Sequence, residues 1–480
     1  MHWDWLLSIG AGFYTAAVVA LSLRILMKRR PVGVTLAWLL FLFILPVLGI
    51  IFYLLFGERY IGRIRAKRAR NQYQDYSKWL ERTLQKQNQY LKNNKPLRPV
   101  MELAQKGFGL PVIGTNKWRL ISHANELFRS LISDLQSARQ VVFIEFYILE
   151  DEGGVHEVLS AMTEAAKRGV QVHLMLDSVG SGAFLKSKRC SEMIKQGVKI
   201  LEVLHAYPFR LTLRRQDLRQ HRKLITIDNQ IAYTGSMNLV DPEFFKTRSG
   251  VGPWIDLMAR LEGDIAKVTQ AALIFDWEME TGTRLEKYLA YPTLANNCET
   301  LMQLLPTGPA FNDEILLQVL LTTVHNARRQ ITLTTPYFVP DDSLLQALKA
   351  AARRGLDVTI IVPKKNDSKL AQLAGRSFYE DLLTAGVKIQ RYVGGLLHTK
   401  TVIIDRDLVL LGSVNLDMRS IWLNFESTLI VDDAEFCAEV QKVVDDYSKN
   451  AELIDLASWV NRPAHRRLLE NIAQLASPLL

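Results

Sequence analysis

Cysteine is scarce in this chain of 480 residues, and the scarcity excludes two kinds of site. The three cysteines are odd in number, widely spaced and never part of a CxxC pair, so they indicate neither a disulfide framework nor a zinc site. They are Cys190, Cys298 and Cys437. The sequence also lacks a dense cluster of Asp, Glu and His. We therefore expect a chain from a reducing compartment that binds no metal and no other cofactor.

Acidic residues are in short supply as well, since 59 Lys and Arg against 49 Asp and Glu leave a net charge of +10. Residues 1–70 hold ten of the basic residues and only two acidic ones, so they carry +8 of this surplus. The remaining 410 residues carry only +2. A nearly neutral body lacks the broad basic excess that holds a nucleic acid. The surplus instead predicts an acidic partner for the N-terminal segment.

Two long apolar runs lie among these N-terminal basic residues. Trp5–Leu23 has nineteen residues without a charge and Pro31–Gly57 has twenty-seven. At about 1.5 Å per residue, each can cross a hydrocarbon core of roughly 30 Å. Pro46 and Gly49 predict a kink in the second run. A cleaved signal peptide fits the first run poorly, because basic residues follow it where a cleavage site should lie. A buried pair of core helices is the remaining alternative.

We therefore expect residues 1–70 to form a transmembrane hairpin with a basic collar. Six basic residues fall within Arg59–Arg70, after the second run, and fewer lie in the loop between the runs. The larger cluster predicts that the bulk of the chain faces the cytoplasm. Basic side chains beside a spanning segment also attract anionic lipid headgroups.

The rest of the chain is organised as a repeat behind a polar connector at residues 71–114. Residues 115–300 and residues 301–480 each read as an apolar strand, a helical pattern that ends in Gly, and another apolar strand. This alternation predicts an α/β protein with two domains, each a mixed and mainly parallel sheet flanked by helices. Pro306–Pro309 reads as the joint between the two domains.

One short motif occurs once in each repeat. It consists of a His, a Lys two positions later, an Asp five positions after the Lys, and a Gly-Ser-x-Asn sequence that begins seven residues after the Asp. The first copy contains His221, Lys223, Asp228, Ser236 and Asn238, and the second contains His398, Lys400, Asp405, Ser413 and Asn415. Two copies in the same register indicate a duplicated functional site.

The spacing within each motif predicts a β-hairpin, because β-branched residues lead into a turn-like break. With a two-residue turn at 229–230, His221 lies opposite Asn238, and a turn at 406–407 makes the second copy equivalent. Since side chains alternate along a strand, His, Lys, Ser and Asn share one face of the hairpin. Each motif Asp points to the other face. The pattern therefore predicts that the aspartates fix the turns rather than transfer protons.

An imidazole, an ammonium, a hydroxyl and an amide on one face suit an anionic tetrahedral group such as phosphate. Two such faces place two imidazoles around one phosphorus atom. A neutral His can then attack in line, while a protonated His donates to the leaving alkoxide. The two lysines can neutralise the phosphoryl oxygens in place of a metal ion. The sequence is symmetric and does not choose which His attacks.

The duplicated HxKxxxxD motif with GSxN resembles that of the phospholipase D superfamily. Nearly the whole chain, including the double-spanning N-terminal segment, is similar to the bacterial cardiolipin synthases of the A type. The stretches that carry this similarity are Asp217–Gln220, Val240–Pro242, Trp254–Arg260, Gly394–Leu397, Asn415–Ser420 and Ser477–Leu480.

The resemblance implies an enzyme of the bacterial inner membrane that converts two phosphatidylglycerol molecules into cardiolipin and glycerol. It implies a phosphatidyl-histidine intermediate and no metal. It also implies that His221 attacks and that His398 serves as general acid and then as general base. Asp256 and Glu426 are the candidates for the carboxylates that orient the imidazoles. On pattern alone, Glu426 fits a solvated carboxylate equally well. The implied catalytic residues are His221, Lys223, Asp228, His398, Lys400 and Asp405, supported around the phosphate by Ser236, Asn238, Ser413, Asn415, Asp256 and Glu426.

Three alternatives to this function stay open on the sequence. A phospholipase D-type hydrolase, or a transferase with another acceptor alcohol, has the same motif, because acceptor choice depends on pocket shape and water exclusion. A nuclease of the superfamily is disfavoured by the neutral body, and a non-catalytic membrane scaffold is disfavoured by the intact motifs. A homo-oligomer is compatible with the sequence, which does not predict one.

Overall fold

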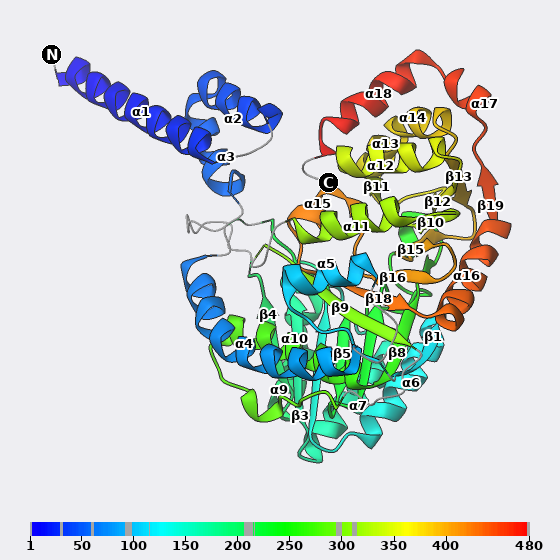
Figure 1. The fold of residues 1–480 in the computed structure, drawn as a ribbon. Coiled ribbons are helices and arrows are strands. Elements are labelled where there is room, and N and C mark those ends of the chain that lie inside the picture. Colours follow the sequence, from blue (N-terminus) through cyan, green and yellow to red (C-terminus); the bar gives the residue numbers. More distant parts are fainter. Residues whose placement is uncertain are drawn as a thin grey trace. The chain divides into compact units, whose positions relative to one another are not determined.

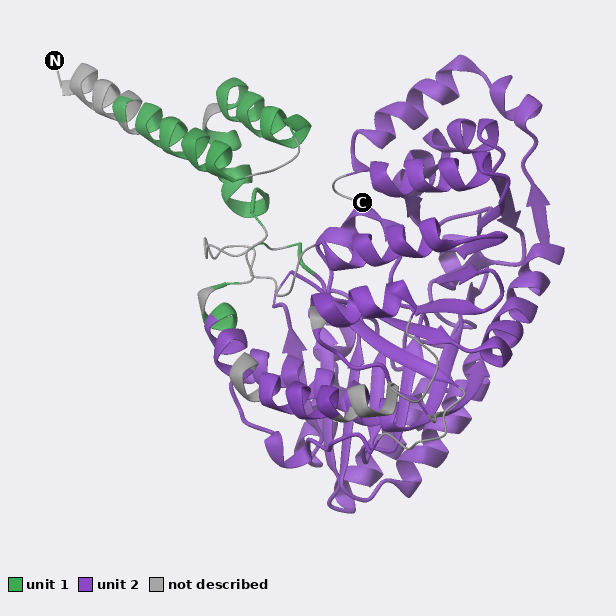
Figure 2. Ribbon diagram, viewed as in Figure 1, with its two compact units in different colours: residues 1–66, 206–218 green, residues 67–205, 219–480 purple. Residues whose placement is uncertain are grey.

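The structure is a computed structural model of the chain. It describes residues 2–28, 32–58, 62–91, 98–114, 116–205, 215, 217–293, 300–309 and 314–477. The residues named above that lie outside this description are Arg29 and Arg30 in the loop between the runs, Pro31, Arg59, Cys298 and Pro478–Leu480. The chain divides into two compact units, one of residues 1–66 and 206–218 and the other of residues 67–205 and 219–480 (Figure 2).

The smaller unit contains the two apolar runs as three helices, α1 (His2–Met27), α2 (Val32–Ile44) and α3 (Pro46–Phe56). The predicted kink is a full break, because Pro46 lacks an N–H group and starts a new helix. The second run is thus two short helices rather than one kinked helix. Across the described residues, we find no helix whose length and apolarity together suffice to cross a membrane.

In the larger unit, two helices precede the first sheet, α4 (Arg63–Leu91, whose first turn belongs to the smaller unit) and α5 (Pro99–Phe108). Helix α4 covers residues 71–91 of the polar connector. Trp79 and Leu80 are buried, and the indole Nε1 of Trp79 donates a hydrogen bond of 3.1 Å to the carbonyl of Ala290. The connector therefore packs on the body of the larger unit.

The first repeat forms a seven-stranded sheet in the order β1-β8-β6-β5-β2-β3-β4. In Figure 1 this part of the chain is coloured from cyan to green. Its strands are β1 (Asn116–Ile121), β2 (Val141–Phe146), β3 (Gln171–Asp177), β4 (Lys199–Val203), β5 (Leu224–Ile227), β6 (Ile231–Gly235) and β8 (Met258–Gly263). Its helices are α6 (Ala124–Ser137), α7 (Val155–Lys167), α8 (Gly182–Leu185), α9 (Lys188–Lys195) and α10 (Asp264–Thr281).

The second repeat forms an eight-stranded sheet in the order β19-β13-β12-β10-β15-β16-β18-β9. Its strands are β9 (Leu301–Thr307), β10 (Gln330–Thr334), β12 (Asp357–Pro363), β13 (Lys388–Tyr392), β15 (Thr401–Ile404), β16 (Leu408–Gly412), β18 (Glu426–Asp432) and β19 (Ala451–Leu453). Its helices are α11 (Ile315–Asn326), α12 (Asp342–Arg353), α13 (Lys369–Ser377), α14 (Tyr379–Thr384), α15 (Met418–Trp422), α16 (Ala434–Lys449), α17 (Leu456–Val460) and α18 (Ala464–Gln474).

Two short strand pairs lie outside the large sheets. One joins β11 (Phe338–Val339) to β17 (Leu416–Asp417) within the second repeat. The other joins β7 (Trp254–Ile255) of the first repeat to β14 (Leu396–Leu397) of the second. The second pair therefore links the two repeats directly, just before the second motif.

The sheets are mixed, but the prediction that they are mainly parallel is wrong. Only β2-β3 and β3-β4 are parallel in the first sheet, and only β10-β12 and β12-β13 in the second. Each motif folds as an antiparallel hairpin, β5-β6 or β15-β16, inside its sheet. The further strands beside these hairpins are antiparallel too, which makes antiparallel pairs the majority.

The predicted joint at Pro306–Pro309 is also wrong in part, because Pro306 and Thr307 belong to strand β9. This strand lies at the edge of the second sheet and pairs with β18. An edge strand tolerates proline, since the missing N–H is not needed on its open side.

One hydrophobic core is shared by both repeats and holds them together. It includes Phe143 and Leu224 from the first sheet and Ile403 and Leu411 from the second, all fully buried. Because Leu224 begins β5 and Leu411 lies on β16, the two motif hairpins meet in this core. Separate apolar clusters lie between each sheet and its outer helices.

The hairpin register differs from the predicted one by a single residue. Ile227 pairs with Ile231, so the loop contains three residues rather than two, and Ile404 pairs with Leu408 in the same way. Asp228 begins the first loop with a φ of 52°, followed by Asn229 at 57°. These residue types tolerate the left-handed region better than most, which allows the longer loop.

The motif aspartates lie in the hairpin loops, and their carboxylates bind backbone groups, as expected of residues that fix the turns. The Asp228 carboxylate accepts hydrogen bonds of 2.7, 2.8 and 2.9 Å from the N–H groups of residues 139, 140 and 141, which lead into β2. The Asp405 carboxylate accepts equivalent bonds of 2.9, 2.7 and 3.0 Å from residues 328, 329 and 330. Each Asp thus ties its hairpin loop to the start of a neighbouring strand.

We expect Asp228→Ala and Asp405→Ala to weaken folding rather than chemistry. Each removes three hydrogen bonds to a charged acceptor and should lower the free energy of unfolding by about 3 kcal/mol. Urea denaturation of the full chain measures this loss. Asp357→Ala is the control, because it removes an exposed ion pair to Lys388 that is worth about 0–1 kcal/mol. Unchanged stability with lost activity would place the aspartates in the reaction instead.

Candidate active site

The two motif histidines line a single pocket of about 280 Å³ in the larger unit. His221 and Asn238 come from the first repeat, and His398 and Asn415 from the second. A more open hollow of about 840 Å³ lies over β1 and α6, and its lining contains no motif residue. The smaller pocket is therefore the candidate active site.

Each motif histidine is held in place by backbone from the other repeat. The His221 N–H donates a hydrogen bond of 2.9 Å to the carbonyl of Phe425, just before β18. The His398 N–H donates one of 2.8 Å to the carbonyl of Ile255 in β7. The two halves of the site are thus built by an exchange of strand segments between the repeats.

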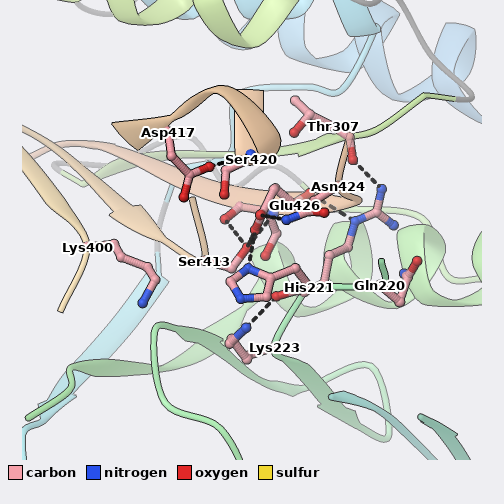
Figure 3. Close-up of polar contacts among 12 residues, drawn as sticks. Gln220, His221, Lys223, Thr307, Lys400, Ser413, Asp417, Ser420, Asn424 and Glu426 are labelled. Carbon is pink, nitrogen blue, oxygen red and sulfur yellow. Dashed lines mark hydrogen bonds and ion pairs between the residues drawn. The ribbon is translucent and has the colours of Figure 1, made fainter. Parts of the chain in front are cut away.

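The predicted orienting carboxylates reach the histidines, and they do so crosswise. His221 Nδ1 lies 2.9 Å from Glu426 Oε2, and His398 Nδ1 lies 2.8 Å from Asp256 Oδ1 (Figure 3 shows the first pair). All four side chains are buried. Each imidazole is therefore paired with the carboxylate that follows the motif of the other repeat, a crossing that spacing along the chain does not reveal.

Burial dominates the protonation of both histidines. It lowers the pKa of His221 to about 4, although Glu426 acts upward, and it lowers the pKa of His398 to about 4 against Asp256. For Glu426 and Asp256 burial acts upward, but the histidine, lysine and serine partners together outweigh it and hold the pKa of each carboxyl below its ordinary value. Neutral imidazoles that donate Nδ1–H to carboxylates keep Nε2 as a free base.

The motif lysines are buried beside the histidines. Lys223 Nζ donates to the carbonyl of His221 at 2.5 Å, and Lys400 Nζ donates to the carbonyl of His398 at 2.6 Å. Burial lowers the pKa of Lys223 to about 7 and that of Lys400 to about 8, while nearby carboxylates act upward. An anion bound in the pocket would favour the charged form of both lysines.

The motif serines support other groups and do not line the pocket. Ser413 Oγ donates to Glu426 Oε2 at 2.5 Å and accepts from the N–H of Ser427 at 2.9 Å. Ser236 Oγ accepts from the N–H of Leu257 at 3.0 Å. The serines therefore fix the segments that carry Glu426 and Asp256.

The motif asparagines line the pocket itself. Asn238 Oδ1 accepts the N–H of Ile148 at 3.2 Å, while its buried Nδ2 has no partner within the described part of the chain. An amide N–H in this position can donate to a phosphoryl oxygen.

Arg222 is a site residue that the sequence interpretation missed. Its side chain is 1% exposed, and Nε donates to the carbonyl of Glu426 at 2.9 Å while Nη2 donates to that of Thr307 at 3.0 Å. It also forms an ion pair with the buried Asp276. Arg222 therefore fastens the first motif to two strands of the second sheet. The sequence did contain a signal for this role. Arg222 lies between His221 and Lys223, so alternation turns its side chain to the opposite face from theirs.

Two aromatic residues that the motifs do not include flank the imidazoles. The ring centroids of Tyr147 and His221 are 4.9 Å apart, and those of Trp254 and His398 are 4.3 Å apart. Both aromatic residues line the pocket. In the ranges that the structure describes, no group of three or more His, Cys, Asp or Glu side chains is arranged to hold a metal ion.

The chain matches two family models. The model described as "Cardiolipin synthase, PLD-like domain" matches residues 131–248 and 320–447, once in each repeat. The model described as "Phospholipase_D-nuclease N-terminal" matches residues 16–58, within the segment of apolar runs.

Curated relatives resemble the chain over its whole length. Cardiolipin synthase A of Edwardsiella ictaluri (strain 93-146) is 44% identical over 481 residues, which cover 99% of this chain and 98% of the relative. Cardiolipin synthase A of Cronobacter sakazakii (strain ATCC BAA-894) is 44% identical over 484 residues with the same coverage.

A solved structure, that of phosphatidylserine synthase from Haemophilus influenzae Rd KW20, has a similar fold. It matches with a TM-score of 0.59 and 16% identity, over 80% of this chain and 100% of that one. This likeness supports the fold, while the full-length identity to the curated relatives supports the family. The chain belongs to the cardiolipin synthase A family, within the phospholipase D superfamily.

Proposed function

We propose that this protein is a phosphatidyltransferase that makes cardiolipin and glycerol from two molecules of phosphatidylglycerol. The observation that carries the proposal is a single pocket with two buried imidazoles, each hydrogen-bonded through Nδ1 to a carboxylate. Full-length similarity to cardiolipin synthases A supports the choice of substrate and product.

In the first half-reaction, His221 Nε2 attacks the phosphorus atom of the donor lipid. An N–P bond forms, the P–O bond to the headgroup glycerol breaks, and His398 gives its proton to the leaving glycerol oxygen. His398 is neutral in the free protein, so it acquires this proton when the anionic phosphodiester enters the pocket. Lys223, Lys400 and the amide of Asn238 stabilise the phosphoryl oxygens.

In the second half-reaction, a hydroxyl of the acceptor phosphatidylglycerol attacks the phosphatidyl-histidine. His398 takes the hydroxyl proton, the new P–O bond forms and the N–P bond breaks, which releases cardiolipin and neutral His221. The steps are reversible. We assign the attack to His221 from the family resemblance, because each of the two imidazoles has a carboxylate partner.

We expect a bell-shaped pH dependence whose acid limb lies unusually low. His221 must be neutral to attack, and a pKa of about 4 keeps it neutral as the pH falls from 7 to 5. Activity is then lost only as the pH falls through that pKa. Measuring kcat/KM for phosphatidylglycerol from pH 3 to pH 9 tests this expectation. An acid limb centred at pH 6.5 or above would contradict a buried, desolvated nucleophile.

Product analysis tests the reaction itself. Purified full-length protein in detergent is given phosphatidylglycerol alone, and the lipid products are resolved. Cardiolipin with an equal amount of glycerol supports the proposal. Phosphatidic acid alone would mean that water is the acceptor, and phosphatidyl transfer only to an added alcohol would mean a different transferase.

We also propose that residues 1–70 anchor the protein as a multi-pass segment in the bacterial inner membrane, with the catalytic domains on the cytoplasmic side. Many apolar side chains of the smaller unit are exposed, among them Leu40 at 61%, Phe43 at 64% and Val47 at 66%. Such side chains favour lipid surroundings. Residues 71–114 serve as the connector, and the change of sheet between β8 and β9 supports domains of residues 115–300 and 301–480.

Fractionation of cells tests the anchor. The full chain should stay in the membrane pellet after alkaline carbonate extraction, and a chain that begins at residue 62 should be released more readily. Protease added to spheroplasts should not cut the catalytic domains, because we place them in the cytoplasm. Extraction of the full chain, or cleavage from outside, would contradict the corresponding part of the proposal.

A further inference from the structure

The proposed reaction requires a second anion-binding position, which the motif residues do not provide. Cardiolipin contains two phosphodiesters joined by one glycerol, and the two motifs surround only the phosphorus atom that reacts. The acceptor lipid brings the second phosphodiester, so the pocket needs a further place for an anion. In the assigned direction, the acceptor glycerol lies on the His398 side, where the first glycerol left.

The His398 side of the pocket holds a polar cluster that neither motif contains. Asp367 and Tyr337 line it from the second repeat, and Lys246 lines it from the first. Tyr337 Oη donates to Asp367 Oδ1 at 2.6 Å, and Lys246 Nζ donates to Asp367 Oδ2 at 3.0 Å. The Asp367 side chain is 11% exposed and that of Lys246 is 45% exposed. The cluster thus runs from a partly buried carboxylate to an accessible ammonium.

Aromatic contacts place this cluster beside His398. Lys246 Nζ lies 5.3 Å from the ring centroid of Trp254, whose ring is 4.3 Å from that of His398. The pKa of Asp367 lies below its ordinary value. Burial acts to raise this pKa, but the contacts with Tyr337, Lys246 and His398 together outweigh burial. Asp367 is therefore an ionised hydrogen-bond acceptor near the general acid.

The backbone of Lys246 adds an independent observation. Its φ of 47° and ψ of 31° put it in the left-handed region, just before the 3-10 turn η1 (Thr247–Ser249). A lysine rarely adopts this conformation, which costs about 1 kcal/mol or more and persists where the surroundings impose it. Strain of this kind gathers at ligand-binding sites, and Lys246 lines the pocket.

We propose that Lys246, Asp367 and Tyr337 form the subsite for the headgroup of the acceptor lipid. This proposal rests on the proposed function. Asp367, held by Tyr337, accepts a hydrogen bond from a glycerol hydroxyl. Lys246, which has three N–H donors, keeps its bond to Asp367 and binds the acceptor phosphodiester with another. The subsite selects a phosphorylated glycerol over free glycerol or water as acceptor.

Two reactions of the same phosphatidyl-enzyme test whether Lys246 binds the acceptor phosphodiester. Full-length protein in mixed micelles of phosphatidylglycerol is assayed for cardiolipin formation and for exchange of labelled free glycerol into phosphatidylglycerol. Free glycerol has no phosphate, so Lys246 matters only for the first reaction. In Lys246→Gln, the ratio of cardiolipin formation to glycerol exchange should fall roughly tenfold or more. Lys246→Arg, which keeps the charge, should preserve most of the ratio.

The ratio cancels any loss of folded protein, because both rates come from one preparation. Lys365→Gln is the matched control, since this exposed lysine lies two residues before Asp367 and outside the pocket lining. An unchanged ratio in Lys246→Gln, or an equal fall in Lys365→Gln, would overturn the subsite.

A second variant tests the glycerol contact. Asp367→Asn should lower both transfer reactions relative to the release of phosphatidic acid, because a hydroxyl-binding carboxylate is lost while water needs none. Unchanged partition between glycerol and water would overturn the role of Asp367. If the unmodified protein exchanges glycerol but forms no cardiolipin, the proposed function itself fails, which is a distinct result.

Discussion

His221→Ala should lower the rate of cardiolipin formation by a factor of about 10^4 or more. It should leave no covalent adduct, because the proposed nucleophile is removed. His398→Ala should be different. Its His221 remains, so phosphatidyl transfer to the imidazole proceeds slowly, but acceptor activation fails and the phosphatidyl-enzyme accumulates. Losing a general acid and base costs about 10^2- to 10^4-fold.

Mass spectrometry of protein quenched after incubation with phosphatidylglycerol detects this adduct and maps it. We expect modification of His221 in the His398→Ala variant and none in His221→Ala. His325→Ala is the control, because this exposed histidine lies at the end of α11 and outside the pocket. A phosphohistidine at position 398 would reverse the assigned roles.

The crossed carboxylates give the second large effect. Glu426 lies in the second repeat but pairs with His221, so Glu426→Gln should resemble a loss of the nucleophile. Asp256 lies in the first repeat but pairs with His398, so Asp256→Asn should resemble a loss of the general acid and accumulate adduct. Removing the carboxylate leaves the imidazole in the wrong tautomer or orientation, which costs about 10^2- to 10^4-fold.

The same adduct assay, combined with rates of cardiolipin formation, distinguishes the two variants. Glu435→Gln, at an exposed position in the first turn of α16, should behave as the unmodified protein. Adduct accumulation in Glu426→Gln, with none in Asp256→Asn, would mean that each carboxylate serves the motif of its own repeat or that the histidine roles are exchanged. The His398→Ala result separates these two explanations.

Local pattern predicted the chemical groups of the site but not their exact register. The pattern correctly predicted that Asp228 and Asp405 fix the turns, because each carboxylate accepts backbone N–H groups from a neighbouring segment. The two-residue turn was wrong, since Asp228 and Asn229 both adopt positive φ and lengthen the loop to three residues. The free energies of a two-residue and a three-residue loop differ little, and the apolar periodicity of the strands does not distinguish between them.

Sheet direction was harder to predict than strand position. The strand-helix-strand units do produce parallel pairs, as between β2 and β3, but the motif hairpins and their neighbours add more antiparallel ones. Pro306 looked like a linker residue and is part of an edge strand. Pairing between distant strands is decided by long-range packing, which a window of sequence does not contain.

The sequence by itself predicted the kind of chemistry, because the duplicated His, Lys and Asn side chains and their spacing fit a phosphate site with two imidazoles. Only the tertiary structure decided which carboxylate serves which imidazole. His221 and Glu426 are 205 positions apart, and they meet because backbone bonds at Phe425 and Ile255 exchange segments between the repeats. The tertiary structure also brings together Lys246 of the first repeat and Asp367 of the second, which are 121 positions apart in the sequence. Such contacts depend on how two sheets share one core, and no local pattern encodes them.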